Sequence, residues 1–181
     1  FTQKMSNIKD DGTSLSFDVT VTNTGNVAGK DVVEVYYNPP YTNGGMEKAS
    51  ANLIAFEKTG LLEPGASETI TVTFDKEEMA SYDMSGTGCY VLEKGDYVIS
   101  INSDSHNILD SKTYTQNSDI RYDADNKRDS DAAAAVNQFG DAAGDITYLS
   151  RADGFANLTE ATAAPSDTNM AEKYVEGYHL N

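Results

Sequence analysis

Hydrophobic and polar residues alternate along several short segments in the first two-thirds of the chain. Leu15, Phe17, Val19 and Val21 are separated by single polar residues, a period of two that predicts a strand with one buried face and one face in water. Similar alternation, or a dense run of β-branched and aromatic residues, occurs at residues 31–37, 53–56, 70–74, 90–92, 97–101 and 111–115. About seven short strands separated by turns are typical of an antiparallel β-sandwich, so the pattern predicts an all-β fold.

Turn and cap signals separate these segments. Glycine and asparagine at residues 23–26 and Pro-Pro at residues 39–40 mark the ends of two strands, because Gly and Asn tolerate positive φ and proline cannot donate to a ladder. Asp75 is followed three residues later by Glu78, the spacing of a helix N-cap and its capping-box partner. We therefore expect a helical turn from Lys76 to Tyr82.

The strand pattern stops near residue 116. The remainder, residues 116–181, is rich in Asp, Ala and Asn and poor in large apolar residues, too poor to build a core of its own. We expect a β-sandwich domain over residues 1–115 and an acidic, largely irregular connector over residues 116–181, with short helices at 129–139 and 169–178. A solvated linker and a segment that lies against another surface both fit this composition.

The charge and the cysteine count exclude several classes of protein. The 181 residues carry 13 Lys and Arg against 29 Asp and Glu, a net charge of −16, which argues against nucleic acid and anionic membranes as partners. No apolar run approaches the roughly 18 residues of a membrane helix. Cys89 is the only cysteine and there are two histidines, so neither an internal disulfide nor a structural zinc site can form.

The candidate catalytic and metal-binding residues are few. His106 and His179 are interpreted as surface residues, and Cys89 as a small core residue. Asp123, Asp125, Asp129 and Asp131 suggest calcium, but an EF-hand loop needs an oxygen ligand at its fifth position and glycine at its sixth. Lys127 and Arg128, or Ala133 and Ala134, occupy those positions. We therefore predict no metal, no cofactor and no catalytic residue.

Carbohydrate binding is the remaining chemistry to consider. The chain has 11 Tyr but no Trp, and Trp is the largest amphipathic ring for stacking on a sugar. Tyr41 lies between Pro39-Pro40 and Gly44-Gly45, a loop that would expose it. Tyr41 is thus the one candidate binding residue, as a contact either to a sugar or to another domain.

The motifs taken together resemble one family. The order and spacing of six of them are similar to the fibronectin type III-like domain of glycoside hydrolase family 3, over about residues 5–110. They are residues 19–29 (VTVTNTGNVAG) with 32–37 (VVEVYY), 53–58 (LIAFEK), 62–65 (LEPG), 71–74 (TVTF), 82–83 (YD) and 92–98 (LEKGDYV). The resemblance implies an immunoglobulin or fibronectin type III-like antiparallel β-sandwich, in which Tyr97 occupies the place of a tyrosine corner.

The resemblance also implies a function for the parent protein. Residues 139–141 (FGD) and 148–153 (YLSRAD) look like the connector of members with inverted domain order, in which a (β/α)8 barrel comes last. Such parents are β-glucosidase-like and cleave glycosidic bonds with two carboxylates. The barrel motif that holds the nucleophile is absent here, since no Ser-Asp pair precedes a Trp.

Two functions stay open at this point, and a weaker third is a cation site in the acidic segment. The first is a non-catalytic module that braces the catalytic domains of the same polypeptide through loops such as residues 38–51. The alternative is an autonomous carbohydrate-binding or adhesion module, in which Tyr41 would contact the sugar.

Overall fold

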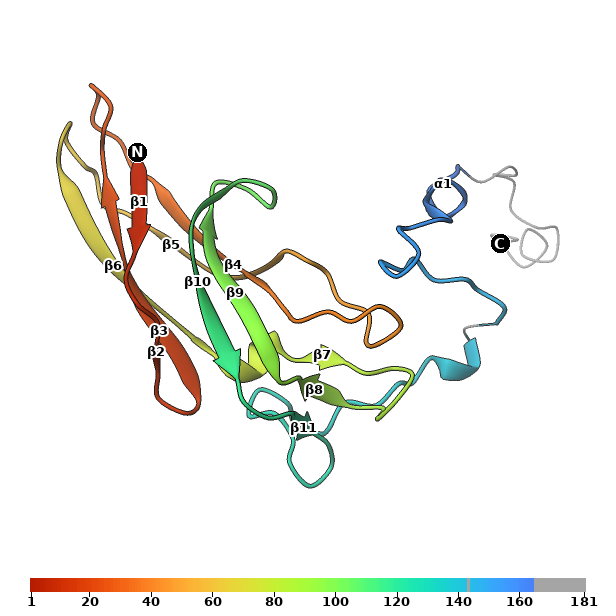
Figure 1. The fold of residues 1–181 in the computed structure, drawn as a ribbon. Helices are drawn as coiled ribbons and strands as arrows, with labels where there is room; N and C mark the ends of the chain where they lie inside the picture. The colour runs from red at the N-terminus through yellow and green to blue at the C-terminus, as the bar shows by residue number, and fades with distance from the viewer. Residues whose placement is uncertain (143, 165–181) are drawn as a thin grey trace, which may run out of the picture. The chain divides into compact units, whose positions relative to one another are not determined.

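The computed structural model describes residues 1–142 and 144–164, which consist mainly of antiparallel β-strands (Figure 1). The strands are β1 (Thr2–Met5), β2 (Lys9–Asp10), β3 (Ser14–Thr22), β4 (Val32–Asn38), β5 (Asn52–Lys58), β6 (Ser67–Asp75), β7 (Ser81–Tyr82), β8 (Tyr90–Leu92), β9 (Gly95–Asn102), β10 (Ile108–Gln116) and β11 (Ile120–Tyr122). The expected all-β class is confirmed, and the apolar stretch at residues 53–56 lies within β5.

Two four-stranded sheets form the body of the domain. In the first, β3 pairs along its whole length with β6, and β1 and β2 pair with the other edge of β3. The second has the strand order β10-β9-β4-β5. A small third sheet, β11-β8-β7, lies at one end of the domain (Figure 1). All pairs are antiparallel, as expected for strands joined by short turns.

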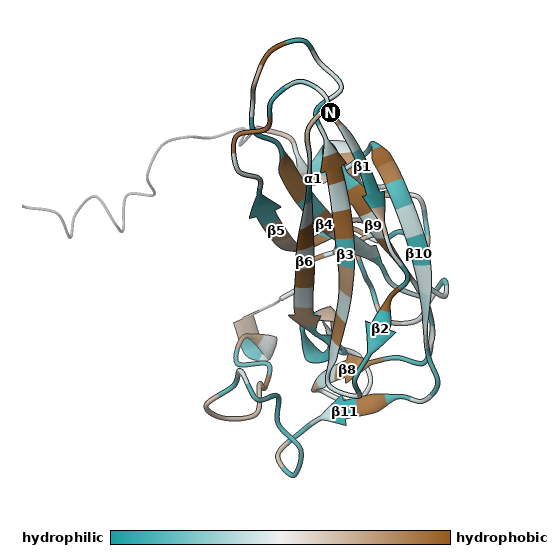
Figure 2. Ribbon diagram, turned by 90° about the vertical axis from the view of Figure 1, so that its left-hand side faces the viewer, coloured by the Kyte–Doolittle hydropathy of each residue, from teal (hydrophilic) through white to brown (hydrophobic). Residues whose placement is uncertain are grey.

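The hydrophobic core lies between the two large sheets. Every second residue of β3, β4 and β9 is fully or almost fully buried, and the side chains of these strands belong to one contiguous cluster. Bands of hydrophobic and hydrophilic residues alternate along β3 (Figure 2). The period of two in the sequence is therefore caused by burial of one side of each strand, as expected.

Tyr97 forms the expected link to the backbone at the start of β9. Its ring is 1% exposed, and its hydroxyl donates to the carbonyl oxygen of Glu93 at 3.0 Å. Burial raises the pKa of the Tyr97 hydroxyl, so the hydroxyl stays a donor at neutral pH. The rings of Tyr37 and Tyr114 lie beside it, with centroids 6.5 and 6.3 Å away. Tyr97 thus ties the turn before β9 to the core.

The helical turn after β6 is present, but it ends at Met79, before β7, and its expected cap is missing. Residues Lys76–Met79 form a 3-10 helix, and Asp75 makes no side-chain cap hydrogen bond. Ser14 lies opposite Asp75 in the β3–β6 ladder, and its hydroxyl donates to the Asp75 carboxylate at 2.6 Å. The cross-strand partner therefore takes the place of the helix amides.

The helix expected at residues 129–139 is wrong, because this segment folds as turns and bends. The backbone N–H groups of Asp129 and Ser130 donate to the Glu77 carboxylate at 2.7 and 3.0 Å. The Arg128 guanidinium lies 3.8 Å from the ring centroid of Tyr90. These tertiary contacts outweigh the helix propensity of the alanines. The second expected helix, at 169–178, and His179 lie outside the described residues.

The chain divides into two compact units, Phe1–Ala143 and Gly144–Asn181. Strand β11 pairs with β8, so residues beyond 115 contribute to the first unit. The described part of the second unit contains one short helix, α1 (Leu158–Ala161). Within residues 1–142 and 144–164, no helix has the length and apolar character of a membrane-spanning segment.

Asp83 organises the turn between β7 and β8. Its carboxylate accepts hydrogen bonds from the backbone N–H groups of Gly86 and Thr87, at 2.9 and 2.7 Å, and from the Thr87 hydroxyl at 3.0 Å. The N–H of Thr87 is the main cause that lowers the pKa of Asp83. A carboxyl whose pKa is depressed by folding stabilises the fold above its unfolded-state pKa of about 3.9, and the stabilisation is lost as the pH falls below that value.

Asp83→Asn is therefore expected to lower the melting temperature by a few degrees at pH 7, and by progressively less as the pH falls below about 4. Thermal unfolding of the isolated chain, followed by circular dichroism across this pH range, measures the difference. Glu63→Gln, at an exposed position, serves as the control. A deficit that is the same at acidic and neutral pH would show that the charge of Asp83 contributes nothing.

Candidate functional site

The outer faces of the two large sheets have opposite chemical character. The outer face of β3 and β6 carries serine, threonine and aspartate side chains. They bond to one another across the ladder in four pairs: Ser14–Asp75 at 2.6 Å, Asp18–Thr71 at 2.6 Å, Thr20–Thr69 at 3.3 Å and Thr22–Ser67 at 2.7 Å. No large hydrophobic side chain is exposed on these two strands, so this face is suited to contact with water.

The outer face of the β10-β9-β4-β5 sheet carries apolar residues instead. Cross-strand pairing aligns two rows that each run over all four strands. The first row is Ile108, Asn102, Glu34 and Phe56, and the second is Ser111, Ser100, Tyr36 and Leu53. We call Tyr36, Leu53, Phe56 and Ile108, together with the strands that carry them, the apolar face.

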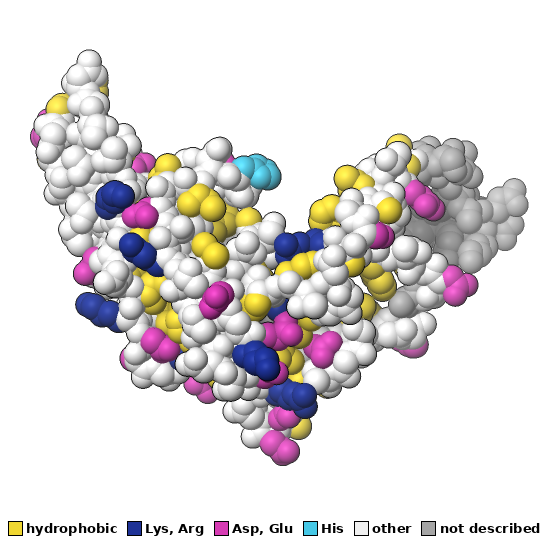
Figure 3. Space-filling model, viewed as in Figure 1, with side chains coloured by type: hydrophobic (Ala, Val, Ile, Leu, Met, Phe, Trp, Pro, Cys, Tyr) yellow, Lys and Arg dark blue, Asp and Glu magenta, His cyan; other side chains and the backbone are white. Residues whose placement is uncertain are grey.

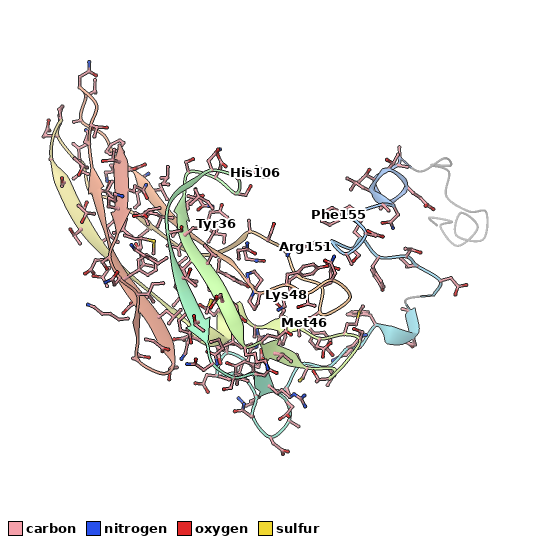
Figure 4. All side chains as sticks on the ribbon, in the orientation of Figure 1. Tyr36, Met46, Lys48, His106, Arg151 and Phe155 are labelled. Carbon is pink, nitrogen blue, oxygen red and sulfur yellow. The ribbon has the colours of Figure 1, made fainter. Side chains whose placement is uncertain are left out.

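Three large side chains of the apolar face are exposed to solvent. Phe56 is 69% exposed, Ile108 59% and Leu53 52%. Hydrophobic side chains gather beside the histidine (Figure 3), which is His106 (Figure 4). Because clustered exposed apolar residues mark interaction sites on folded proteins, the apolar face is the candidate functional surface of this domain.

Two β-bulges place these side chains on one face. In the β4–β5 pair, Leu53 lies opposite Tyr36 and Phe56 opposite Glu34, with a register shift between them. The extra residue in β5 lets two side chains that are three positions apart point to the same side. A second shift in β10 does the same for Ile108 and Ser111.

A groove crosses the apolar face between β4 and the loop that joins β9 to β10. Its polar lining includes Asn38, Ser50, Ser100 and Asn102. Tyr36 and His106, both labelled in Figure 4, also line it. Asn102 is only 3% exposed, and its side-chain oxygen Oδ1 has no hydrogen-bond partner in the part of the chain that the structure describes. Of the described residues that line this groove, none is Asp or Glu.

The loop between β4 and β5, expected to contact another domain, is anchored from within. Lys48 is 6% exposed, and its ammonium donates to the carbonyl oxygen of Pro40 at 2.8 Å and contacts the Glu93 carboxylate. Gly95 has a φ of +137°, and a Cβ there would lie 2.9 Å from the Pro40 side chain. The loop is thus fixed against the turn that Tyr97 also binds. Tyr41, the candidate sugar or inter-domain contact, is half-buried in this loop, and its role stays a prediction.

The other residues singled out in the sequence have ordinary surroundings. Cys89 is buried, as expected. His106 is exposed, and its backbone N–H donates to Asp104. Within the acidic segment, the Asp131 carboxylate binds the Arg128 guanidinium through two hydrogen bonds of 2.8 and 2.9 Å. Residues 1–142 and 144–164 bring together no group of three His, Cys, Asp or Glu residues that could hold a metal ion.

Comparison with known proteins agrees with this architecture. Residues 31–105 match the family model described as "Fibronectin type III-like domain". This match spans β4 to β9 and includes Glu34, Tyr36, Leu53, Phe56 and Asn102.

Two curated relatives that the chain resembles are β-glucosidases. The chain is 44% identical over 82 residues to β-glucosidase A of Butyrivibrio fibrisolvens, a match that covers 44% of the chain and 10% of the relative. It is 37% identical over 113 residues to a β-glucosidase of Ruminococcus albus, covering 60% of the chain and 12% of the relative. The chain thus spans about a tenth of the length of these curated relatives.

The solved structures are similar in fold over two-thirds of the chain. β-Glucosidase 3B of Thermotoga neapolitana, in complex with α-D-glucose, superposes with a TM-score of 0.59 and 32% identity, covering 67% of this chain and 16% of that one. The β-glucosidase of Kluyveromyces marxianus gives a TM-score of 0.61 with 25% identity, covering 66% of this chain and 14% of that one.

Proposed function

Residues 31–105 form a fibronectin type III-like domain of the kind found in β-glucosidases of glycoside hydrolase family 3, and from this premise we propose that the chain is a non-catalytic module that braces the catalytic domains of such an enzyme. The partners are domains of the same polypeptide. The chain corresponds to only 10–16% of the length of its relatives, so an enzyme of that size offers ample surface for docking.

The contrast between the two outer faces is the observation that carries this proposal. The polar side chains of β3 and β6 satisfy one another across the ladder, whereas β5 and β10 expose Leu53, Phe56 and Ile108. Burying apolar surface yields about 25 cal/mol per Å². A partner domain on the apolar face would therefore gain free energy that the opposite face does not offer.

The buried interior of the module supports a bracing role. The second large sheet is held by the contiguous core, and the β4–β5 loop is fixed by Lys48 and by the turn at Glu93. A rigid module that binds two catalytic domains would keep their shared cleft in register. Displacements of about 1 Å in an active site can cost about 100-fold in rate, so such a brace could affect turnover without contacting the substrate.

We assign residues 116–181 to a connector that leads toward the following domain. Within this connector, the described part of the second compact unit of the chain exposes Ile146, Tyr148 and Leu158. A segment of this composition needs another surface for its apolar side chains. The domain boundary near residue 115 is part of this proposal, and β11 and residues 128–130 are then the stretch of the connector that packs on the sandwich.

The isolated chain is expected to show no hydrolysis of an aryl β-glucoside, because the two carboxylates that the reaction needs belong to other domains. Release of nitrophenol from p-nitrophenyl β-glucoside by the purified chain measures this, with the complete enzyme as the positive control. Titration with cello-oligosaccharides tests the alternative function. Turnover that co-elutes with the chain, or saturable sugar binding that is lost in Tyr41→Ala, would contradict the proposal.

A further inference from the structure

Hydrogen-bond acceptors without strong donors lie at the centre of the apolar face. Glu34 and Asn102 are directly opposite each other in the β4–β9 ladder, and side chains so paired have Cβ atoms about 5 Å apart. The Glu34 carboxylate accepts one hydrogen bond, from the Tyr36 hydroxyl at 3.1 Å. No ion pair to Glu34 is formed within the described residues.

Two amide oxygens beside Glu34 are buried and unpartnered. Asn102 Oδ1 and Gln3 Oε1 have no hydrogen-bond partner among the described residues, and their side chains are 3% and 8% exposed. Both residues line a second groove, together with Glu34 and Asp31, which is distinct from the groove between β4 and the β9–β10 loop. Gln3 Nε2 donates to Asp31 at 2.9 Å and to the Val32 carbonyl oxygen at 3.0 Å, which fixes the Gln3 amide so that its oxygen is left over. A buried acceptor without a donor costs about 1–3 kcal/mol.

Apolar side chains flank these acceptors on the first cross-strand row. Phe56 is adjacent to Glu34, and Ile108 is adjacent to Asn102. Phe56 and Ile108 lie beside the groove, and the groove itself is lined by the Phe1 ring as well as by the acceptors. Acceptors flanked by aromatic and aliphatic side chains are complementary to arginine. The guanidinium carries five N–H donors and no acceptor, pairs with carboxylates and stacks on aromatic faces, while its methylene stem packs on apolar groups.

We propose that this groove is a socket for an arginine side chain presented by the domains that the module braces, an inference that rests on the proposed function. The net charge of −16 favours a cationic partner group. Lys30 and Lys58 also line the groove and are exposed. Each lysine carries a compact ammonium group and lacks the planar array of donors of the guanidinium. The two lysines therefore compete for Glu34 but do not match all the acceptors.

The socket can be tested on the 181-residue chain alone. N-acetyl-L-arginine amide is titrated into the isotopically labelled chain, and nuclear magnetic resonance follows the backbone signals of Glu34 and Asn102. N-acetyl-L-citrulline amide has a similar shape and lacks the charge. We expect saturable shifts at both residues, with binding of the citrulline probe weaker by about two- to fivefold, the factor typical of a lost cation–π or ion-pair contact.

Variants identify the acceptors. Glu34→Gln is expected to reduce arginine binding to the level of citrulline, and Asn102→Ala to weaken it. Asp18→Asn, which alters a carboxylate on the opposite, polar face, should leave it unchanged. The spectra of the variants report whether each one is folded.

Three results would overturn the socket: no saturable shift with arginine, equal binding of the two probes, or unchanged binding in Glu34→Gln. None of them bears on whether Leu53 and Phe56 are covered in the complete enzyme. Failure of the socket and failure of the bracing function are therefore distinguishable.

Discussion

Replacing both Leu53 and Phe56 by serine in the complete enzyme is expected to loosen the contact between this module and the catalytic domains. The two side chains are 52% and 69% exposed in the chain itself. The apolar area that the substitutions remove is therefore area that a partner domain could bury. Full burial of such a side chain is worth about 1.5–3 kcal/mol. We expect a lower melting temperature of the complete enzyme and a decrease of about tenfold or more in kcat/KM, because the cleft loses its alignment.

The same double substitution should leave the isolated chain as stable as before, because neither side chain belongs to the buried core. A matched pair on the opposite face, Thr69→Ser with Thr71→Ser, keeps the hydroxyls that bond to Thr20 and Asp18 and should leave the complete enzyme unchanged. Thermal unfolding and kinetics of both variants, in both forms of the protein, test the prediction. Equal effects from the two faces, or none from the apolar face, would contradict it.

Tyr97→Ala is expected to have the largest effect on the stability of the isolated chain, about 3–5 kcal/mol of unfolding free energy, the usual cost of removing a large buried aromatic side chain. The Tyr97 ring is 1% exposed and packs beside the rings of Tyr37 and Tyr114. Its hydroxyl also donates to the carbonyl oxygen of Glu93, the same residue whose carboxylate contacts Lys48. The loss should therefore loosen the β4–β5 loop as well.

Tyr97→Phe separates the two contributions. It keeps the ring and removes the hydrogen bond, so we expect a cost of about 1 kcal/mol. Urea unfolding of both variants, followed by fluorescence or circular dichroism, gives the two free energies. If Tyr97→Phe were as damaging as Tyr97→Ala, the hydroxyl rather than the packing of the ring would hold the turn.

The strands and the tyrosine corner could be predicted because their signals are local. A period of two records burial of one strand face within a few residues, and β3, β4, β6 and β9 all follow it. Asn23 is an intermediate case. The turn at Asn23 and Gly25 follows from residue type, but Asn23 is also 1% exposed and donates to the carbonyl oxygens of Val27 and Leu62. The second of these contacts spans 39 residues, so the sequence around Asn23 gives no sign of it.

The apolar face could not be predicted, because it depends on the order of strands and on two bulges. Leu53 and Phe56 are three positions apart, which in a regular strand would place them on opposite faces. Only the register shift in the β4–β5 pair brings them to one side. The helix expected at 129–139 failed for a related reason, since the amides of Asp129 and Ser130 bind Glu77, a residue about 50 positions earlier in the chain.

Side-chain footprinting by hydroxyl radicals tests the central claim most directly. The isolated chain and the complete enzyme are oxidised in parallel, and the modification of each residue is read by mass spectrometry. The account predicts that Tyr36, Leu53, Phe56 and Ile108 are oxidised in the isolated chain and protected in the complete enzyme, while Val27, which is 73% exposed and outside the apolar face, reacts equally in both. Undiminished oxidation of Phe56 and Ile108 in the complete enzyme would show that no domain covers this face, and the proposed bracing contact would be wrong.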